Sequence, residues 1–131
     1  MHGDDFESLQ RLFEQQPGVK SVILFGSVAR QEERFDSDID IAVDLGHPMD
    51  AEERSSLMAE ISARTARPVD LVDLAKAGEP LLGQILTKGR RVAGSDEAYA
   101  ALLSRHLIDQ ADFLPYRNRI LDERRKAWIG N

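Results

Sequence analysis

Two aspartates, one residue apart, lie inside an apolar segment that otherwise has the composition of a buried strand. Asp38 and Asp40 belong to the stretch SDIDIAV, and Asp70 occupies a similar place in the later stretch PVDLVDL. Carboxylates are costly inside such segments unless something compensates for their charge. Their hard oxygen atoms suit Mg²⁺, which completes its shell with water and substrate phosphates. The pattern therefore predicts a metal site formed by these three acids.

The turn that precedes the two aspartates has the composition of a phosphate-binding turn. Gly26 and Ser27 follow the apolar run VILF, and ten residues separate Ser27 from Asp38. Gly26 permits close backbone approach, and Ser27 is expected to open a helix whose N–H groups favour a phosphate. Arg30, one turn later, can donate to the same anion. Two Mg²⁺ ions about 3.5–4 Å apart would hold the attacking and leaving oxygens of a phosphoryl displacement.

The choice of the third acid rests on the alternation of side chains along a strand. Asp70 and Asp73 face opposite sides of the predicted strand. Asp70 has the earlier position, which matches that of Asp40, so we expect it to join the metal site and keep Asp73 as the alternative. Asp44 shares the face of Asp40 but lies at the far end of its strand, where a solvated acid is expected.

The elements that must position these residues alternate between helix and strand. Helices are predicted over residues 4–16, 27–33, 51–65 and 79–88 and from 95 almost to the C-terminus, and strands over 19–25, 39–45, 68–74 and 90–93. Asp50, with Glu53 three residues later, forms a capping-box pattern at the start of one helix. Pro115 is expected to break or kink the last helix.

The site also predicts how the strands run. If Ser27 is to meet Asp38, the first two strands must be antiparallel. If Asp40 is to meet Asp70, the second and third strands must be parallel, joined by a right-handed crossover through the helix at 51–65. The fold class is therefore α/β (α+β), with a small mixed β-sheet flanked by helices. We expect a single domain over residues 1–131, with its catalytic core at about 19–94 and a C-terminal helical extension at about 95–129.

Composition narrows the possible classes of protein. The chain has 131 residues, 42% of them hydrophobic, a net charge of −6 and no cysteine. Disulfides and thiolate metal sites are thus excluded, and direct nucleic-acid binding driven by charge is not expected. No apolar run approaches the roughly 20 residues that span a bilayer, and the polar N-terminus is unlike a signal peptide. We expect no membrane association and a cytoplasmic location.

Other polar residues are less informative. The histidines have no spacing typical of a metal site or a catalytic triad and are expected at the surface or in turns: His2, His47 and His106. A basic cluster after the fourth predicted helix is either solvated or close to a substrate: Lys88, Arg90 and Arg91. The basic segment 116–128, which includes Tyr116 and Trp128, either docks on a partner or covers its own core.

The stretch GSVARQEERFDSDIDIAV resembles the G-S-x10-D-x-D signature of the polymerase-β-like nucleotidyltransferase superfamily, and PVDLVDL resembles the strand that carries its third acid. The short chain and the stretch LLGQILTKGRRVAG are similar to minimal nucleotidyltransferases, specifically MntA-type antitoxins, which are paired with HEPN-domain ribonuclease toxins. The resemblance covers nearly the whole chain, most strongly residues 19–94. It implies a nucleotidyltransferase fold and the transfer of AMP from ATP to a tyrosine of the toxin, which silences the ribonuclease.

Two alternatives stay open at this point. The first is a nucleotidyltransferase that acts on RNA or on a small molecule such as an aminoglycoside. Two features count against it. There is no second domain to hold the acceptor, so the acceptor must bring its own binding surface. The net charge of the chain is also acidic. The second is an antitoxin that inhibits its partner by binding alone. The complete set of motif residues counts against a vestigial site: Ser27, Asp38, Asp40 and Asp70.

Overall fold

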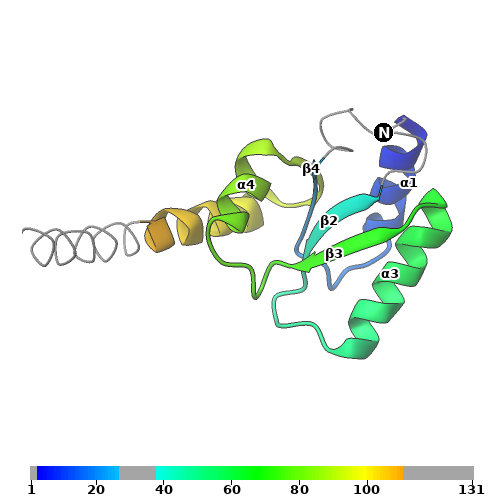
Figure 1. The fold of residues 1–131 in the computed structure, drawn as a ribbon, viewed down its shortest axis with the longest axis horizontal. Coiled ribbons are helices and arrows are strands. Elements are labelled where there is room, and N and C mark those ends of the chain that lie inside the picture. The colour runs from blue at the N-terminus through cyan, green and yellow to red at the C-terminus, as the bar shows by residue number, and fades with distance from the viewer. Residues whose placement is uncertain (1–2, 27–37, 111–131) are drawn as a thin grey trace, which may run out of the picture.

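The computed structural model of the protein describes residues 3–26 and 38–110, and these residues include a four-stranded sheet. The strands lie in the order β3-β2-β1-β4 (Figure 1). Their bounds are β1 Ser21–Phe25, β2 Ile39–Asp44, β3 Val69–Asp73 and β4 Arg90–Gly94. The helices are α1 Gly3–Glu14, α3 Ala51–Thr65, α4 Leu81–Lys88 and a further helix over residues 96–110.

The sheet is mixed, as the sequence predicts. β1 and β2 are antiparallel, with Phe25 opposite Asp40. β2 and β3 are parallel, with Asp40 opposite Asp70, and α3 makes the crossover between them. β4 runs antiparallel to β1 on its other side. The predicted strand directions and the short edge strand after α4 are thus confirmed.

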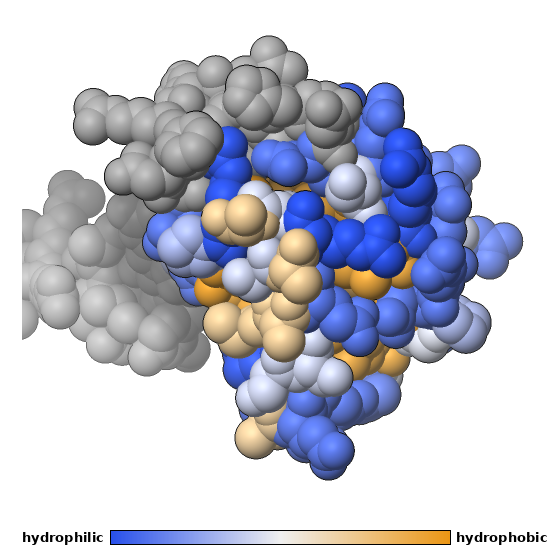
Figure 2. Space-filling model, turned by 90° about the vertical axis from the view of Figure 1, so that its right-hand side faces the viewer, coloured by the Kyte–Doolittle hydropathy of each residue, from blue (hydrophilic) through white to orange (hydrophobic). Residues whose placement is uncertain are grey.

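Helices cover both faces of this sheet. α1 and α3 pack on one face, and α4 packs on the other together with the helix at 96–110 (Figure 1). The core under α1 and α3 includes Phe6, Leu9, Leu24, Ile41, Leu57, Ile61 and Leu71. The core on the opposite face includes Ile23, Ala42, Leu82, Ile85, Leu86 and Leu102. Figure 2 views the molecule from the side of α1 and α3, where hydrophilic side chains predominate.

The start of α3 is held by the predicted capping box. The Asp50 carboxylate accepts a hydrogen bond from Glu53 N at 2.7 Å, and the Glu53 carboxylate accepts one from Asp50 N at 3.1 Å. Further along α3, Arg54 donates from its guanidinium to the carbonyl oxygen of Leu71 at 2.7 Å. α3 is therefore joined to the edge strand β3 by a polar contact as well as by the apolar core.

The helix at 96–110 is joined to the rest of the protein by side-chain hydrogen bonds. Arg105 donates to the carbonyl oxygens of Leu74 and Ala77, in the loop between β3 and α4. The Tyr99 hydroxyl donates to the carbonyl oxygen of Leu86 at 3.0 Å. These contacts fix the helix against α4 and the loop before it.

Some bounds differ from the prediction. β1 begins at Ser21 rather than Val19, because Val19 N donates to Gln16 O at 3.0 Å and so belongs to the preceding turn. α4 begins at Leu81, after Pro80 as its N-cap. The predicted helix at 27–33 and the kink at Pro115 lie outside the described residues. None of the helices within the described ranges is both long and apolar enough to cross a bilayer.

Candidate active site

Parallel pairing of β2 and β3 brings two acids together. Asp40 and Asp70 are register partners, and directly paired residues of neighbouring strands face the same side of a sheet. Val72, two residues after Asp70, packs in the core under α4, so the acids lie on that face, beyond the end of its apolar core. Asp40 is half-buried and Asp70 is exposed. The predicted meeting of these two strands at their acidic ends is therefore present.

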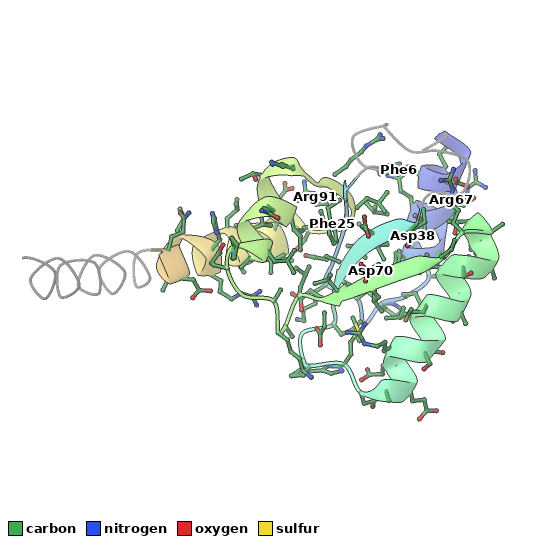
Figure 3. The ribbon with its side chains drawn as sticks, in the orientation of Figure 1. Phe6, Phe25, Asp38, Arg67, Asp70 and Arg91 are labelled. Carbon is green, nitrogen blue, oxygen red and sulfur yellow. The ribbon has the colours of Figure 1, made fainter. Side chains whose placement is uncertain are left out.

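Asp38 stands just before β2, two residues from Asp40 and on the same face by alternation. Figure 3 has Asp38 and Asp70 at the same end of the sheet, and both are exposed. Within the described residues, no three carboxylate or imidazole groups stand close enough together to hold one metal ion. The structure thus brings Asp40 and Asp70 together, with Asp38 at the border of the pair.

Gly26 lies directly against this acid pair. Its φ angle is +74°, which favours glycine, and a Cβ atom at this position would overlap Oδ2 of Asp40. The close neighbour of Gly26 in the structure is the Asp40 carboxylate. The approach of Gly26 to a phosphate stays a prediction. Ser27 and Arg30, the other predicted phosphate ligands, lie outside the described residues.

Asp73, the alternative third acid, has a different role. It is 5% exposed, and its carboxylate accepts hydrogen bonds from Met49 N at 2.8 Å and Ala75 N at 3.0 Å. These bonds join the loop before α3 to the loop after β3. Asp44, at the other end of β2, accepts a hydrogen bond from Gly46 N at 2.8 Å. Both residues stabilise turns, and Asp70 is the acid that lies beside Asp40.

Phe25 borders the site, and the sequence analysis does not single it out. It is the register partner of Asp40 and packs against the core under α4. Its ring therefore lies on the same face as the acids, on the side toward α4 (Figure 3). The alternation of β1 could have placed Phe25 on this face, but only the register with β2 puts it opposite Asp40.

The basic cluster after α4 is largely engaged in contacts with neighbouring elements. The guanidinium of Arg90 lies 3.8 Å from the centroid of the Phe6 ring of α1. Arg91 pairs with Asp96 at 2.8 Å and lies 5.0 Å from the ring centroid of Tyr99. Lys88 is the exposed last residue of α4.

Two histidines form pairs with glutamates. His47 lies in a turn, as predicted, and its ring meets Glu53 at 2.9 Å. The hydrogen bond to Glu53 raises the pKa of His47 above its ordinary value. The same hydrogen bond lowers the pKa of Glu53.

His106 differs from the prediction of a surface or turn residue. Its Nδ1 contacts the Glu79 carboxylate, and the two side chains are only 12% and 15% exposed. Gly83 makes this burial possible, because a Cβ atom there would lie 2.6 Å from Cε1 of His106. Residues this far apart in sequence give no spacing signal for such a pair. His2 lies outside the described residues.

A cavity of about 260 Å³ lies away from the acids. Its lining includes Leu45 and His47, which follow the far end of β2, and Val19 and Leu57 on its apolar side. Asp40 lies near the opposite end of β2. The acid pair is thus an open site at one end of the sheet, separate from this cavity.

The chain is similar to known proteins in both sequence and fold. The protein adenylyltransferase MntA of Shewanella oneidensis is 34% identical over 87 residues, covering 64% of this chain and 63% of that protein. The matched region is therefore a little under two thirds of the length of this curated relative. A crystal structure of a toxin–antitoxin with AMP-PNP superposes with a TM-score of 0.74 at 26% identity, covering 94% of this chain and 98% of that chain.

A solved MntA–HepT toxin–antitoxin structure superposes with a TM-score of 0.68 at 25% identity, covering 92% of this chain and 95% of that chain. The nucleotidyltransferase fold expected from the sequence is confirmed by these matches. The family model for polymerase beta nucleotidyltransferases matches residues 7–98, which include all four strands, α3, α4 and most of α1. The chain belongs to the polymerase beta nucleotidyltransferase family.

Proposed function

We propose that this protein is an antitoxin that transfers AMP from ATP to a tyrosine of a HEPN-domain ribonuclease toxin. The observation that carries the proposal is the acid pair of Asp40 and Asp70, held in register on neighbouring strands with Gly26 against it. The relatives support the choice of reaction and partner, since one is named as a protein adenylyltransferase and others are toxin–antitoxin structures.

The donor atoms of the site fit a divalent cation. Asp40 and Asp70 lie side by side and supply hard carboxylate oxygens, which suit Mg²⁺, with Asp38 at the border of the pair; water and substrate phosphates would complete the shell of one or two ions. When bound, Mg²⁺ would neutralise charge on the phosphate oxygens and make the acceptor hydroxyl easier to deprotonate. The open position of Asp38 and Asp70, both exposed, leaves room for a nucleotide and for an acceptor side chain.

The residues of this chain then have separate tasks. Ser27 and Arg30 would hold the triphosphate beyond the Gly26 turn, as their place in the motif implies. The tyrosine oxygen attacks the α-phosphorus, the bond from that phosphorus to the bridging oxygen breaks, and pyrophosphate leaves with the electron pair. Asp70, on the edge strand, would take the hydroxyl proton at its carboxylate. The AMP group is then joined to the toxin by a phosphodiester bond.

Intact-mass spectrometry of the toxin tests the proposal directly. A purified HEPN-domain toxin is incubated with this protein, ATP and Mg²⁺, separated from it and weighed. We expect a mass gain of one or more AMP units and lasting loss of ribonuclease activity. The double variant Asp38→Asn with Asp40→Asn should give no mass gain. An unmodified toxin that is silent only while the complex persists would overturn the proposal in favour of inhibition by binding.

A further inference from the structure

Lys88 stands at the end of the sheet that carries the acid pair. β4 runs antiparallel beside β1, with Leu24 opposite Arg90, so the residues before β4 lie beside the end of β1. Gly89 fits against this end so closely that a Cβ atom on it would lie 2.8 Å from the carbonyl oxygen of Leu24. Lys88 is the last residue of α4 and directly precedes Gly89, so α4 ends beside the end of β1 that leads into Gly26.

Gly26, at this end of β1, lies between β2, which carries Asp40 of the acid pair, and the β4 side of the sheet, where α4 ends. On the β2 side of Gly26, the Asp40 carboxylate is in contact with the glycine. On its β4 side, α4 ends at Lys88 and the chain enters β4 through Gly89. Arg90 and Ile41 are both register partners of Leu24, and neighbouring strands lie about 4.8 Å apart. The backbones of these two residues, which are close in sequence to Lys88 and Asp40, are therefore roughly 10 Å apart. A nucleotide whose phosphates cross the Gly26 turn would meet carboxylates at one end and this lysine at the other.

Lys88 also has the charge that such a nucleotide requires. Its neighbours in the basic cluster are engaged, Arg90 with the Phe6 ring and Arg91 with Asp96. The Lys88 side chain is exposed and makes no hydrogen bond or ion pair within the part of the chain that the structure describes. Its ammonium group is a compact charge with three donors on a flexible stem, which suits a phosphate approached from one side.

We propose that Lys88 binds the β- or γ-phosphate of the nucleoside triphosphate, across Gly26 from Asp40 and Asp70. This inference rests on the proposed nucleotidyl transfer. As the acceptor oxygen bonds to the α-phosphorus and the bond to the bridging oxygen breaks, negative charge grows on the departing pyrophosphate. Lys88 stabilises that charge, and no proton or electron pair passes through it.

Binding measurements with two nucleotides test this role. Isothermal titration in Mg²⁺ compares AMP-PNP with AMP on the wild-type protein and on Lys88→Met. Because a charged hydrogen bond is lost, we expect the Kd for AMP-PNP to rise about tenfold or more. The Kd for AMP, which has no β- or γ-phosphate, should change less than about twofold. Lys88→Arg keeps the charge and should retain most of the AMP-PNP affinity.

Lys76→Met is the matched control. Lys76 is an exposed lysine in the loop after β3, at the opposite end of that strand from Asp70, and its replacement should leave both affinities unchanged. Wild-type affinity of Lys88→Met for AMP-PNP, or an equal loss for AMP, would overturn the role of Lys88 and leave the proposed transfer intact. Failure of the wild-type protein to bind AMP-PNP with Mg²⁺ would overturn both.

Discussion

At the scale of single residues, the site depends on how closely a backbone can approach a carboxylate. Gly26 has a positive φ angle and lies against Oδ2 of Asp40, so the position has neither the conformation nor the space for a side chain. Asp40 is in turn fixed by its register with Phe25 on one side and Asp70 on the other. The geometry of the acid pair is therefore coupled to the turn that leads toward the predicted phosphate ligands.

Replacement of Gly26 by alanine should damage both stability and transfer. The left-handed backbone costs a non-glycine residue about 1–2 kcal/mol, and the added Cβ must displace the Asp40 carboxylate. We expect a lower melting temperature and a loss of AMP transfer to the toxin. Gly18→Ala is the control, because a Cβ atom at Gly18 would meet nothing within 4 Å. Thermal unfolding and transfer assays that do not distinguish the two variants would contradict this account of Gly26.

At the scale of elements, α3 is the crossover that makes β2 and β3 parallel, and its first turn is held by polar contacts. Asp50 and Glu53 exchange hydrogen bonds in the capping box, and Glu53 also meets His47. The contact of His47 with Glu53 is an ion pair only when His47 is protonated, so this part of the turn's stability depends on pH, whereas the N-cap hydrogen bond of Asp50 is a separate part. Separate variants can measure the two parts.

The contribution of His47 should be confined to mildly acidic pH. Its pKa is raised above 6.5, so its stabilising effect is complete below that value and is lost as pH rises through the raised pKa. The pKa of Glu53 is lowered below 4.5, so its contribution is present above 4.5 and is lost at lower pH. Thermal unfolding should therefore find His47→Ala slightly less stable than wild type at pH 5.5 and equal to it at pH 8.5.

Asp50→Ala provides the comparison for this experiment. Loss of the N-cap should lower the free energy of unfolding by about 1 kcal/mol at both pH values. A pH-independent effect of His47→Ala would mean that its contact with Glu53 is not an ion pair in solution.

The elements themselves could largely be predicted, because their signals are local. The capping box spans four consecutive residues, and the parallel pairing of β2 and β3 follows from the requirement that Asp40 and Asp70 meet. Contacts between distant segments could not be predicted in the same way. The pairing of His106 with Glu79 depends on how closely two helices pack at Gly83. Burial of Asp73 likewise depends on a loop that returns from the far end of β2.

At the scale of the whole molecule, the helix at 96–110 is attached to the layer that covers the acid-bearing face. Arg105 donates to two carbonyl oxygens of the loop between β3 and α4, and Tyr99 donates to one in α4. His106 adds its contact with Glu79. β3, α4 and this helix are thus connected by backbone carbonyls as well as by apolar packing.

Removal of the Arg105 side chain should loosen this connection. Arg105→Ala leaves the carbonyl oxygens of Leu74 and Ala77 without their charged donor, a loss of about 1.5–3 kcal/mol. Hydrogen exchange should increase along the helix at 96–110 while β1 and β2 stay protected. Arg64→Ala, at an exposed position in the last turn of α3, should leave exchange unchanged. Equal hydrogen exchange along this helix in the wild-type protein, Arg105→Ala and Arg64→Ala would contradict the role of Arg105.

The contact of Arg54 with Leu71 affects how separate molecules meet. β3 is an outer strand, and the free backbone groups of such strands can recruit a strand from another chain and so begin aggregation. The Arg54 guanidinium already occupies the carbonyl oxygen of Leu71 in the middle of β3. This contact from a charged side chain of α3 thereby hinders another strand from pairing with the edge of the sheet beside Asp70. β3, which carries Asp70, can thus stay exposed at the edge of the sheet without serving as a template for other copies of the chain.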